Sequence, residues 1–208
     1  MTGIQKRMHR EYLDNNIWVI KNFLSKEEID TIMSESIKNN GLSFDEGGWI
    51  FKDESITRKT NSIQIKVLRE ESPRRLLEKE NGIFDRIQKE FLEYGNYKKN
   101  YTLQKIVPCQ SDLGLSFHAE QSNGNNKSMT AGIIIYLNDN FGGGELVFKN
   151  KNITVLPESG MLICIPPTVE YEHAVKNVTY GERHTLYGHV WENVDNAPSN
   201  VPEDYRVK

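Results

Sequence analysis

Two patterns of apolar residues divide the chain near residue 100. Before that point, apolar residues recur at helical spacing in two segments, one after Ser25 and one beginning at residues 72–73. Ser25 and Glu28 match a capping box, which predicts the first turn of the earlier helix. We expect residues 39–41 (Asn-Asn-Gly) to end this helix, and Gly82 to divide the later one.

After residue 100, short β-rich runs alternate with turns. Two earlier strands are expected at 16–24 and 63–67. The later runs are 101–107, 113–117, 130–137, 145–148, 153–156, 161–165, 169–175 and 183–191. Closely spaced strands without intervening helices predict a sandwich, barrel or jelly roll. Because the helices precede the strands, we expect an α+β fold with the helices packed on one sheet.

The whole chain, 1–208, is expected to form a single domain. Residues 1–100 would provide helical and strand support, 101–191 the β core, and 192–208 a polar tail. Residues 1–14 are expected to be a loosely held arm, and residues 42–62 a hairpin or long loop. Trp49 and Phe51 in that loop would pack in the core or contact a substrate.

Composition excludes several classes of protein. Hydrophobic residues make up 37% of the chain and charged residues 26%, which is typical of a folded domain. A net charge of −3 gives no reason to expect nucleic acid as a partner. The longest apolar run, around residues 131–137, is too short to cross a membrane. With no apolar leader and only Cys109 and Cys164, which we expect to be buried thiols, a cytoplasmic location is expected.

The motif His118-Ala119-Glu120 is the first candidate for chemistry. On a strand, residues i and i+2 point to the same face, so both side chains could bind one metal ion. A third ligand from a distant strand would complete a two-histidine, one-carboxylate set with open positions, which suits non-haem Fe(II) enzymes that activate O2. Taken alone, this short motif also occurs by chance in many proteins.

A distal group of residues strengthens the metal hypothesis. His173 lies 55 residues after His118, and Arg183 follows ten residues later. An Arg inside a β core needs an anion, and its two parallel donors suit a carboxylate. Thr185 would point the same way and add a hydroxyl. The alternative is a surface ion pair for Arg183, with the histidines in solvent.

Further motifs lie in a fixed order around these residues. Tyr136-Leu137-Asn138 precedes the Gly142–Phe148 segment, Leu156–Ile163 carries a P-x-x-G pattern, and Gly188–Trp191 closes the region. Residues 19–25 precede the first helix. With the H-x-E motif, His173 and Arg183, these segments resemble the Fe(II)/2-oxoglutarate-dependent dioxygenases of the prolyl 4-hydroxylase branch, over about residues 17–191.

The resemblance implies a double-stranded β-helix (jelly roll) as the catalytic core over residues 101–191, together with a catalytic site and its cofactors. The Fe(II) ligands would be His118, Glu120 and His173. Arg183, the fourth catalytic residue, would pair with the C5 carboxylate of 2-oxoglutarate, assisted by Tyr136 and Thr185. O2 would be the second cosubstrate, and ascorbate is a candidate cofactor. The implied reaction is hydroxylation of a C–H bond, with a prolyl residue of a peptide or protein as the substrate.

The sequence departs from the family pattern in two ways. The carboxylate ligand is Glu120 where the family has Asp, and Leu115 and Pro108 stand where the family often has Tyr. The missing Tyr residues remove part of the usual pocket wall. A hydroxylase of a free amino acid or small metabolite, and a non-catalytic β-sandwich relative, therefore stay open as alternatives. Nucleic-acid dealkylation is disfavoured by the acidic net charge.

Overall fold

A large antiparallel sheet is the centre of the molecule. The computed structural model describes residues 8–38, 63–67, 81–97, 102–106, 108, 112–121 and 128–192. The large sheet has the strand order β1-β2-β11-β7-β14-β5-β3, and β4 also pairs with β14. Its strands are β1 (Glu11–Tyr12), β2 (Trp18–Ile20), β11 (Leu162–Ile165), β7 (Met129–Tyr136), β14 (Arg183–Trp191), β5 (Thr102–Ile106), β3 (Ile63–Val67) and β4 (Asn96–Tyr97).

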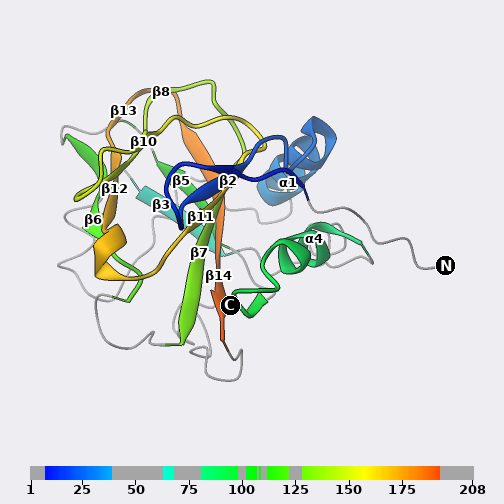
Figure 1. Cartoon of the computed structure of the whole chain (residues 1–208). Helices are drawn as coiled ribbons and strands as arrows, with labels where there is room; N and C mark the ends of the chain where they lie inside the picture. Colours follow the sequence, from blue (N-terminus) through cyan, green and yellow to red (C-terminus); the bar gives the residue numbers. More distant parts are fainter. Residues whose placement is uncertain are drawn as a thin grey trace.

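A smaller antiparallel sheet lies on one side of the large sheet, and two helices lie on the other (Figure 1). The small sheet has the order β10-β9-β12-β6. Its strands are β10 (Thr154–Val155), β9 (Leu146–Phe148), β12 (His173–Lys176) and β6 (Leu113–His118). A separate pair joins β8 (Gly142–Gly143) to β13 (Val178–Tyr180), and a short 3-10 helix, η1 (Val169–Tyr171), precedes β12.

Alternation along the central strands divides the apolar side chains between two clusters. The helix-side cluster contains the buried residues Trp18, Ile20, Phe23, Leu24, Ile29, Ile32, Ile83, Phe84, Ile87, Phe91, Ala131, Ile133, Ile135, Leu137, Leu162, Cys164, Leu186 and Val190. The interior cluster contains Ile17, Val19, Ile106, Tyr136, Phe141, Leu146, Phe148, Val155, Met161, Ile163, Ile165, Tyr171, Val175 and Val178. The interior cluster includes residues of both sheets, so it is the core of a β-sandwich.

The two described helices begin at recognisable signals. In α1 (Lys26–Lys38), the Ser25 N–H donates to Glu28 Oε2 at 3.0 Å, and the Glu28 N–H donates to Ser25 Oγ at 3.2 Å. This confirms the predicted capping box. The second helix, α4 (Ile83–Glu90), begins directly after Gly82 and buries Ile83, Phe84 and Ile87.

Most expected strands are present, two of them (β3 and β14) with the expected bounds and several others shortened, and two expectations are wrong. The segment 169–175 is not one strand, because η1 turns the chain before β12 begins at His173. The arm is not loosely held over residues 8–14. Its strand β1 pairs with β2, and the Arg10 guanidinium lies over the Trp18 ring, 4.1 Å from its centroid. The expectations also missed the short strands β4, β8 and β13.

Several expectations lie outside the described residues. They concern the end of the first helix at 39–41, the loop 42–62 with Trp49 and Phe51, Cys109, and residues 193–208 of the tail. Cys164 is described and is a buried free thiol, as predicted. Neither α1 nor α4, the helices of the described part, is long and apolar enough to cross a membrane.

Candidate metal and cosubstrate site

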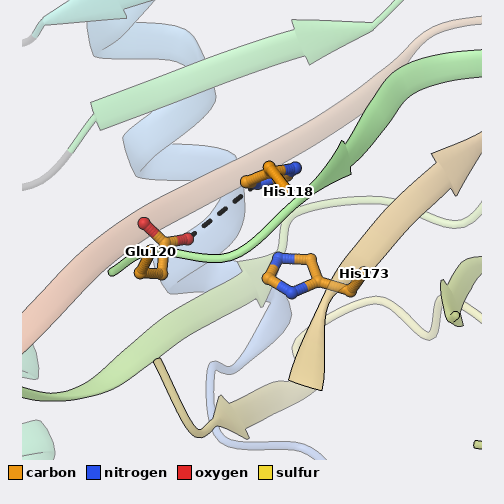
Figure 2. A group of neighbouring side chains, drawn as sticks. All are labelled: His118, Glu120 and His173. Atoms are coloured by element: carbon orange, nitrogen blue, oxygen red, sulfur yellow. Dashed lines mark ion pairs between the residues drawn. The ribbon is translucent and has the colours of Figure 1, made fainter. Parts of the chain in front are cut away.

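Three of the predicted site residues meet at the edge of the small sheet. His118 ends β6 and His173 begins β12, and the two residues are direct register partners. One possible ligand atom from each of His118, Glu120 and His173 lies within 4.8 Å of the others. Figure 2 shows the three side chains pointing toward one another. This spacing allows the three groups to hold one metal ion.

An irregularity in β6 turns His118 toward the interior. Leu115 pairs with Val175 and His118 pairs with His173, so two residues of β6, Ser116 and Phe117, lie opposite the single residue Ala174. This is a β-bulge, which reverses the alternation of side chains beyond it. Leu115 packs against the interior cluster, whereas Phe117 is 37% exposed. Without the bulge, His118 would face away from His173.

Both histidines are oriented by backbone carbonyls. Nδ1 of His118 lies 2.8 Å from the Ser116 carbonyl oxygen, and Nδ1 of His173 lies 3.0 Å from that of Tyr171. A carbonyl oxygen can only accept a hydrogen bond, so each Nδ1 carries the proton. Nε2 of each ring therefore keeps its lone pair, which is the form in which a neutral imidazole binds a metal.

Glu120 reaches the site from a turn. The expectation that it shares a strand face with His118 is wrong, because β6 ends at His118 and residue 120 is already in the turn. The turn is held by the next residue. The Gln121 N–H donates to the Pro167 carbonyl at 3.0 Å, and its side-chain amide donates to the Met129 carbonyl at 2.9 Å. The carboxylate still lies beside His118, with Oε1 4.0 Å from Nε2.

The charges of the site favour metal binding. Burial acts to raise the pKa of Glu120, but the hydrogen bond with His189 and the charges of three histidines outweigh it and lower the pKa from 4.5 to about 2. Burial, together with the charge of His118, lowers the pKa of His173 below its usual 6.5. At neutral pH the site therefore presents a carboxylate and a neutral His173, the protonation states that ligate metals.

Arg183 supplies a buried cation without an anion. It is 0% exposed, and none of its three guanidinium nitrogens has a hydrogen-bond partner in the described part of the chain. Its Cζ lies 4.9 Å from the centroid of the Tyr136 ring, and the Tyr136 hydroxyl also has no partner there. Because a buried unpaired charge is strongly unfavourable, this arrangement calls for a bound anion.

The other predicted residues lie around this cation. Thr185 is 0% exposed and is the direct register partner of Tyr136. Its hydroxyl is 3.5 Å from Gln104 Oε1, at the limit of a hydrogen bond. Gly144 lies against the Arg183 stem, since a Cβ there would be 3.1 Å from Arg183 Cδ. The orphaned guanidinium and hydroxyl fit a carboxylate, and the His-Glu-His donor set fits Fe(II).

Sequence reasoning missed one residue of this region, His189. Its Nε2 lies 3.1 Å from Glu120 Oε2. His189 follows Arg183 and Thr185 along β14 at even separations, so the alternation of a strand places it on the same face. The even spacing of Arg183, Thr185 and His189 is therefore the sequence signal that could have identified His189 as part of this region.

A two-histidine, one-carboxylate set of possible ligands is typical of non-haem Fe(II) oxygenases. Residues 106–191, which contain all these groups, match the family model described as the 2OG-Fe(II) oxygenase superfamily. Over these residues, fewer than half of the 208, the chain is similar to the 2OG-Fe(II) oxygenase superfamily. The match indicates a 2-oxoglutarate-dependent dioxygenase, with Fe(II) as cofactor and 2-oxoglutarate and O2 as cosubstrates. No curated protein matches the sequence.

Several solved structures share the fold. A prolyl hydroxylase from Trichoplax adhaerens, in complex with a peptide fragment of the hypoxia inducible factor oxygen degradation domain, has a TM-score of 0.64 at 16% identity, covering 90% of this chain and 88% of that one. The viral collagen prolyl hydroxylase of Paramecium bursaria Chlorella virus-1, in its 2OG complex, has a TM-score of 0.56 at 18% identity, covering 84% and 94%. A 2OG-Fe(II) oxygenase family protein from Burkholderia pseudomallei has a TM-score of 0.61 at 14% identity, covering 86% and 85%.

Proposed function

We propose that this dioxygenase hydroxylates a prolyl residue of a peptide or protein, on a jelly-roll core whose large sheet carries the helices. The observation that carries the cosubstrate assignment is the buried, unpartnered Arg183 guanidinium beside the Tyr136 hydroxyl. The prolyl substrate is supported by the fold shared with prolyl hydroxylases from a virus and from Trichoplax adhaerens.

The roles of the site residues follow from their chemistry. We assign Fe(II) to Nε2 of His118, Nε2 of His173 and the carboxylate of Glu120. Arg183 would form an ion pair with the C5 carboxylate of 2-oxoglutarate. Tyr136 would donate its hydroxyl proton to the same carboxylate, and Thr185 would add a second hydroxyl from the neighbouring strand.

In the mechanism, the chain binds and orients the reactants. When bound, Fe(II) and 2-oxoglutarate supply the oxidising chemistry, in which O2 is consumed, succinate and CO2 are released, and a C–H bond becomes C–OH. Arg183 holds one end of the cosubstrate, so that its other end is directed to the histidine cluster. The interior cluster includes Phe148, the partner of His173 on the neighbouring strand β9, and Val175 on β12 itself, and it excludes water from this end of the site.

A turnover assay tests the proposal. The protein is supplied with Fe(II), 2-oxoglutarate and O2, and succinate formation is measured against panels of proline-containing peptides and free amino acids. We expect succinate formation to be stimulated by a prolyl peptide, with a mass increase of one oxygen on the proline. Stimulation by a free amino acid and by no peptide would contradict the prolyl assignment. Succinate formation by the Glu120→Ala variant at the wild-type rate would contradict the metal site.

One observation favours a second candidate, a hydroxylase of a free amino acid or small metabolite. Leu115 packs partly buried against the interior cluster, at a position where the resembled family often has Tyr. Leu115 has no hydroxyl with which to hold a peptide backbone. The amino-acid arm of the same assay distinguishes the two substrates.

A further inference from the structure

The two carboxylate oxygens of Glu120 face different partners. Oε1 lies 4.0 Å from His118 Nε2, on the side of the metal-ligand cluster. Oε2 lies 3.1 Å from His189 Nε2. An ionised carboxylate can only accept, so the His189 Nε2–H donates this hydrogen bond. His189 therefore engages one oxygen and leaves the other toward the two histidine ligands.

The His189 ring is itself held between two aromatic neighbours on β14. The Tyr187 ring lies edge-on to it with centroids 5.0 Å apart, and the Trp191 ring lies edge-on at 6.2 Å. These contacts limit rotation of the imidazole, which is only 19% exposed. The donor is therefore fixed in place before any ligand binds.

The Glu120 side chain lies beside the strand opposite, at ordinary van der Waals distance from the position of a Cβ at Gly132. Gly132 of β7 is the direct register partner of His189. A Cβ at Gly132 would lie 3.5 Å from Glu120 Cγ and 3.8 Å from Oε1. Glu120 thus extends over a glycine toward His189, a path that uses the additional methylene of Glu relative to Asp.

We propose that His189 is a positioning residue that fixes the Glu120 carboxylate for metal binding, with Oε1 as the metal ligand. The proposal rests on the metal site assigned above. Glu has one more rotatable bond than Asp, so a free Glu carboxylate would sample more orientations. A hydrogen bond from a ring that is already ordered removes that freedom. Outer groups of this kind typically contribute 10–100-fold to metal affinity.

The first test measures binding of Mn(II) to the full-length protein without 2-oxoglutarate. The variants are His189→Phe, which keeps a planar ring but removes the donor, and His189→Gln, whose amide nitrogen can replace Nε2–H. We expect His189→Phe to weaken Mn(II) binding by about 10–100-fold and His189→Gln to recover most of the loss. The matched control is His9→Phe at an exposed histidine, which should bind Mn(II) as the wild type does.

A double-mutant cycle tests whether His189 acts through Glu120. The shorter side chain of Glu120→Asp should not reach His189. We therefore expect His189→Phe to weaken Mn(II) binding strongly in the wild type but less than about threefold in the Glu120→Asp background. Equal fold-losses in both backgrounds would show that His189 acts independently of Glu120, and would overturn the proposal.

Glu120→Ala separates this proposal from the metal site on which it depends. If Glu120→Ala loses Mn(II) affinity while His189→Phe keeps it, only the role of His189 is refuted. If Glu120→Ala binds Mn(II) as tightly as the wild type, the metal-site assignment fails, and the role of His189 fails with it. The absorption spectrum of bound Co(II) gives a second readout. We expect His189→Phe to change it and His189→Gln to restore it.

Discussion

Arg183 shows most clearly how one residue specifies a ligand. Its guanidinium is fully buried, stacks on Tyr136 and has no hydrogen-bond partner in the described part of the chain. A buried cation without an anion destabilises the protein, so its presence is best explained by what binds there. Arg183 therefore lowers the stability of the ligand-free protein and raises its affinity for an anionic ligand. Both quantities can be measured.

Arg183→Leu should weaken ligand binding without destabilising the ligand-free protein. The substitution removes the charge but fills much of the same volume. We expect 2-oxoglutarate affinity to fall by about 30–1000-fold, which corresponds to about 2–4 kcal/mol for lost charge-assisted hydrogen bonds, while Mn(II) affinity stays near wild type. The ligand-free variant should be at least as stable as the wild type, because no unpaired charge remains. Calorimetric titration and thermal unfolding with and without 2-oxoglutarate measure both quantities. Unchanged 2-oxoglutarate affinity would remove Arg183 from the site.

A substitution at Gly144 would disturb the Arg183 side chain less than a substitution of Arg183 itself. Its φ is +71°, and a Cβ would lie 2.8 Å from the Phe141 ring and 3.1 Å from Arg183 Cδ. We expect Gly144→Ala to destabilise the fold by about 1–3 kcal/mol, and to weaken 2-oxoglutarate binding less than Arg183→Leu does. Urea denaturation and 2-oxoglutarate titration provide the measurements. Wild-type stability in Gly144→Ala would show that the turn tolerates a side chain here.

At the scale of elements, the β6 bulge explains why the residues of the candidate metal site could be predicted from the sequence while their relative positions could not. Leu113, Leu115 and Phe117 alternate as in a regular strand, which would place Phe117 inside and His118 outside. The bulge reverses this order. Nothing in the alternation of residues 113–118 encodes the extra residue, because a bulge is defined by the pairing with β12, which is distant in sequence. The order of motifs predicted the three candidate ligands, whereas strand pairing determines how they meet.

The capping box of α1 is an element whose contribution can be measured. Ser25 and Glu28 exchange hydrogen bonds at the helix start. We expect Ser25→Ala to reduce the free energy of unfolding by about 1 kcal/mol, because a backbone N–H at the helix start loses its acceptor. Ser34→Ala, at an exposed position inside the same helix, is the control and should change stability by less than about 0.5 kcal/mol. Urea denaturation followed by circular dichroism compares the two. Equal effects would contradict the role of the cap.

At the scale of the whole molecule, pairing over long sequence distances is what the sequence could not predict. Apolar residues predict strands at 16–24 and 161–165, and the structure has β2 and β11 there. Their adjacency was not predicted, although Val19 pairs with Ile163 across the sheet. Likewise, β5 pairs with β14, and β3 pairs with the other edge of β5. Alternation reports which face of a strand is buried but not which strand lies next to it, since every apolar strand offers the same backbone groups.

The first described residues are tied to a helix that follows about eighty positions later. Arg10 donates to the carbonyl oxygen of Glu90 and to the carboxylate of Glu93, and its Nε lies 3.6 Å from Glu90 Oε2. The Met8 N–H donates to Glu90 Oε1 at 3.0 Å. The side chains of Arg10 and Glu90 are only 10% and 5% exposed. Removing one partner of such a nearly buried charge pair leaves the other charge unpaired, which lowers the free energy of unfolding.

Arg10→Met should therefore be strongly destabilising. It leaves the Glu90 carboxylate buried without its counter-charge, and we expect the free energy of unfolding to fall by about 3–5 kcal/mol. The Arg10→Met, Glu90→Gln double variant removes the uncompensated charge and should recover a large part of that loss.

Mn(II) affinity of the folded variants should be unchanged, because Trp18, on which Arg10 stacks, belongs to the helix-side cluster and not to the interior cluster. Urea denaturation of the single and double variants decides the outcome. If Arg10→Met alone costs less than about 1 kcal/mol, or the double variant recovers nothing, the arm is held by packing on Trp18 and not by this charge pair.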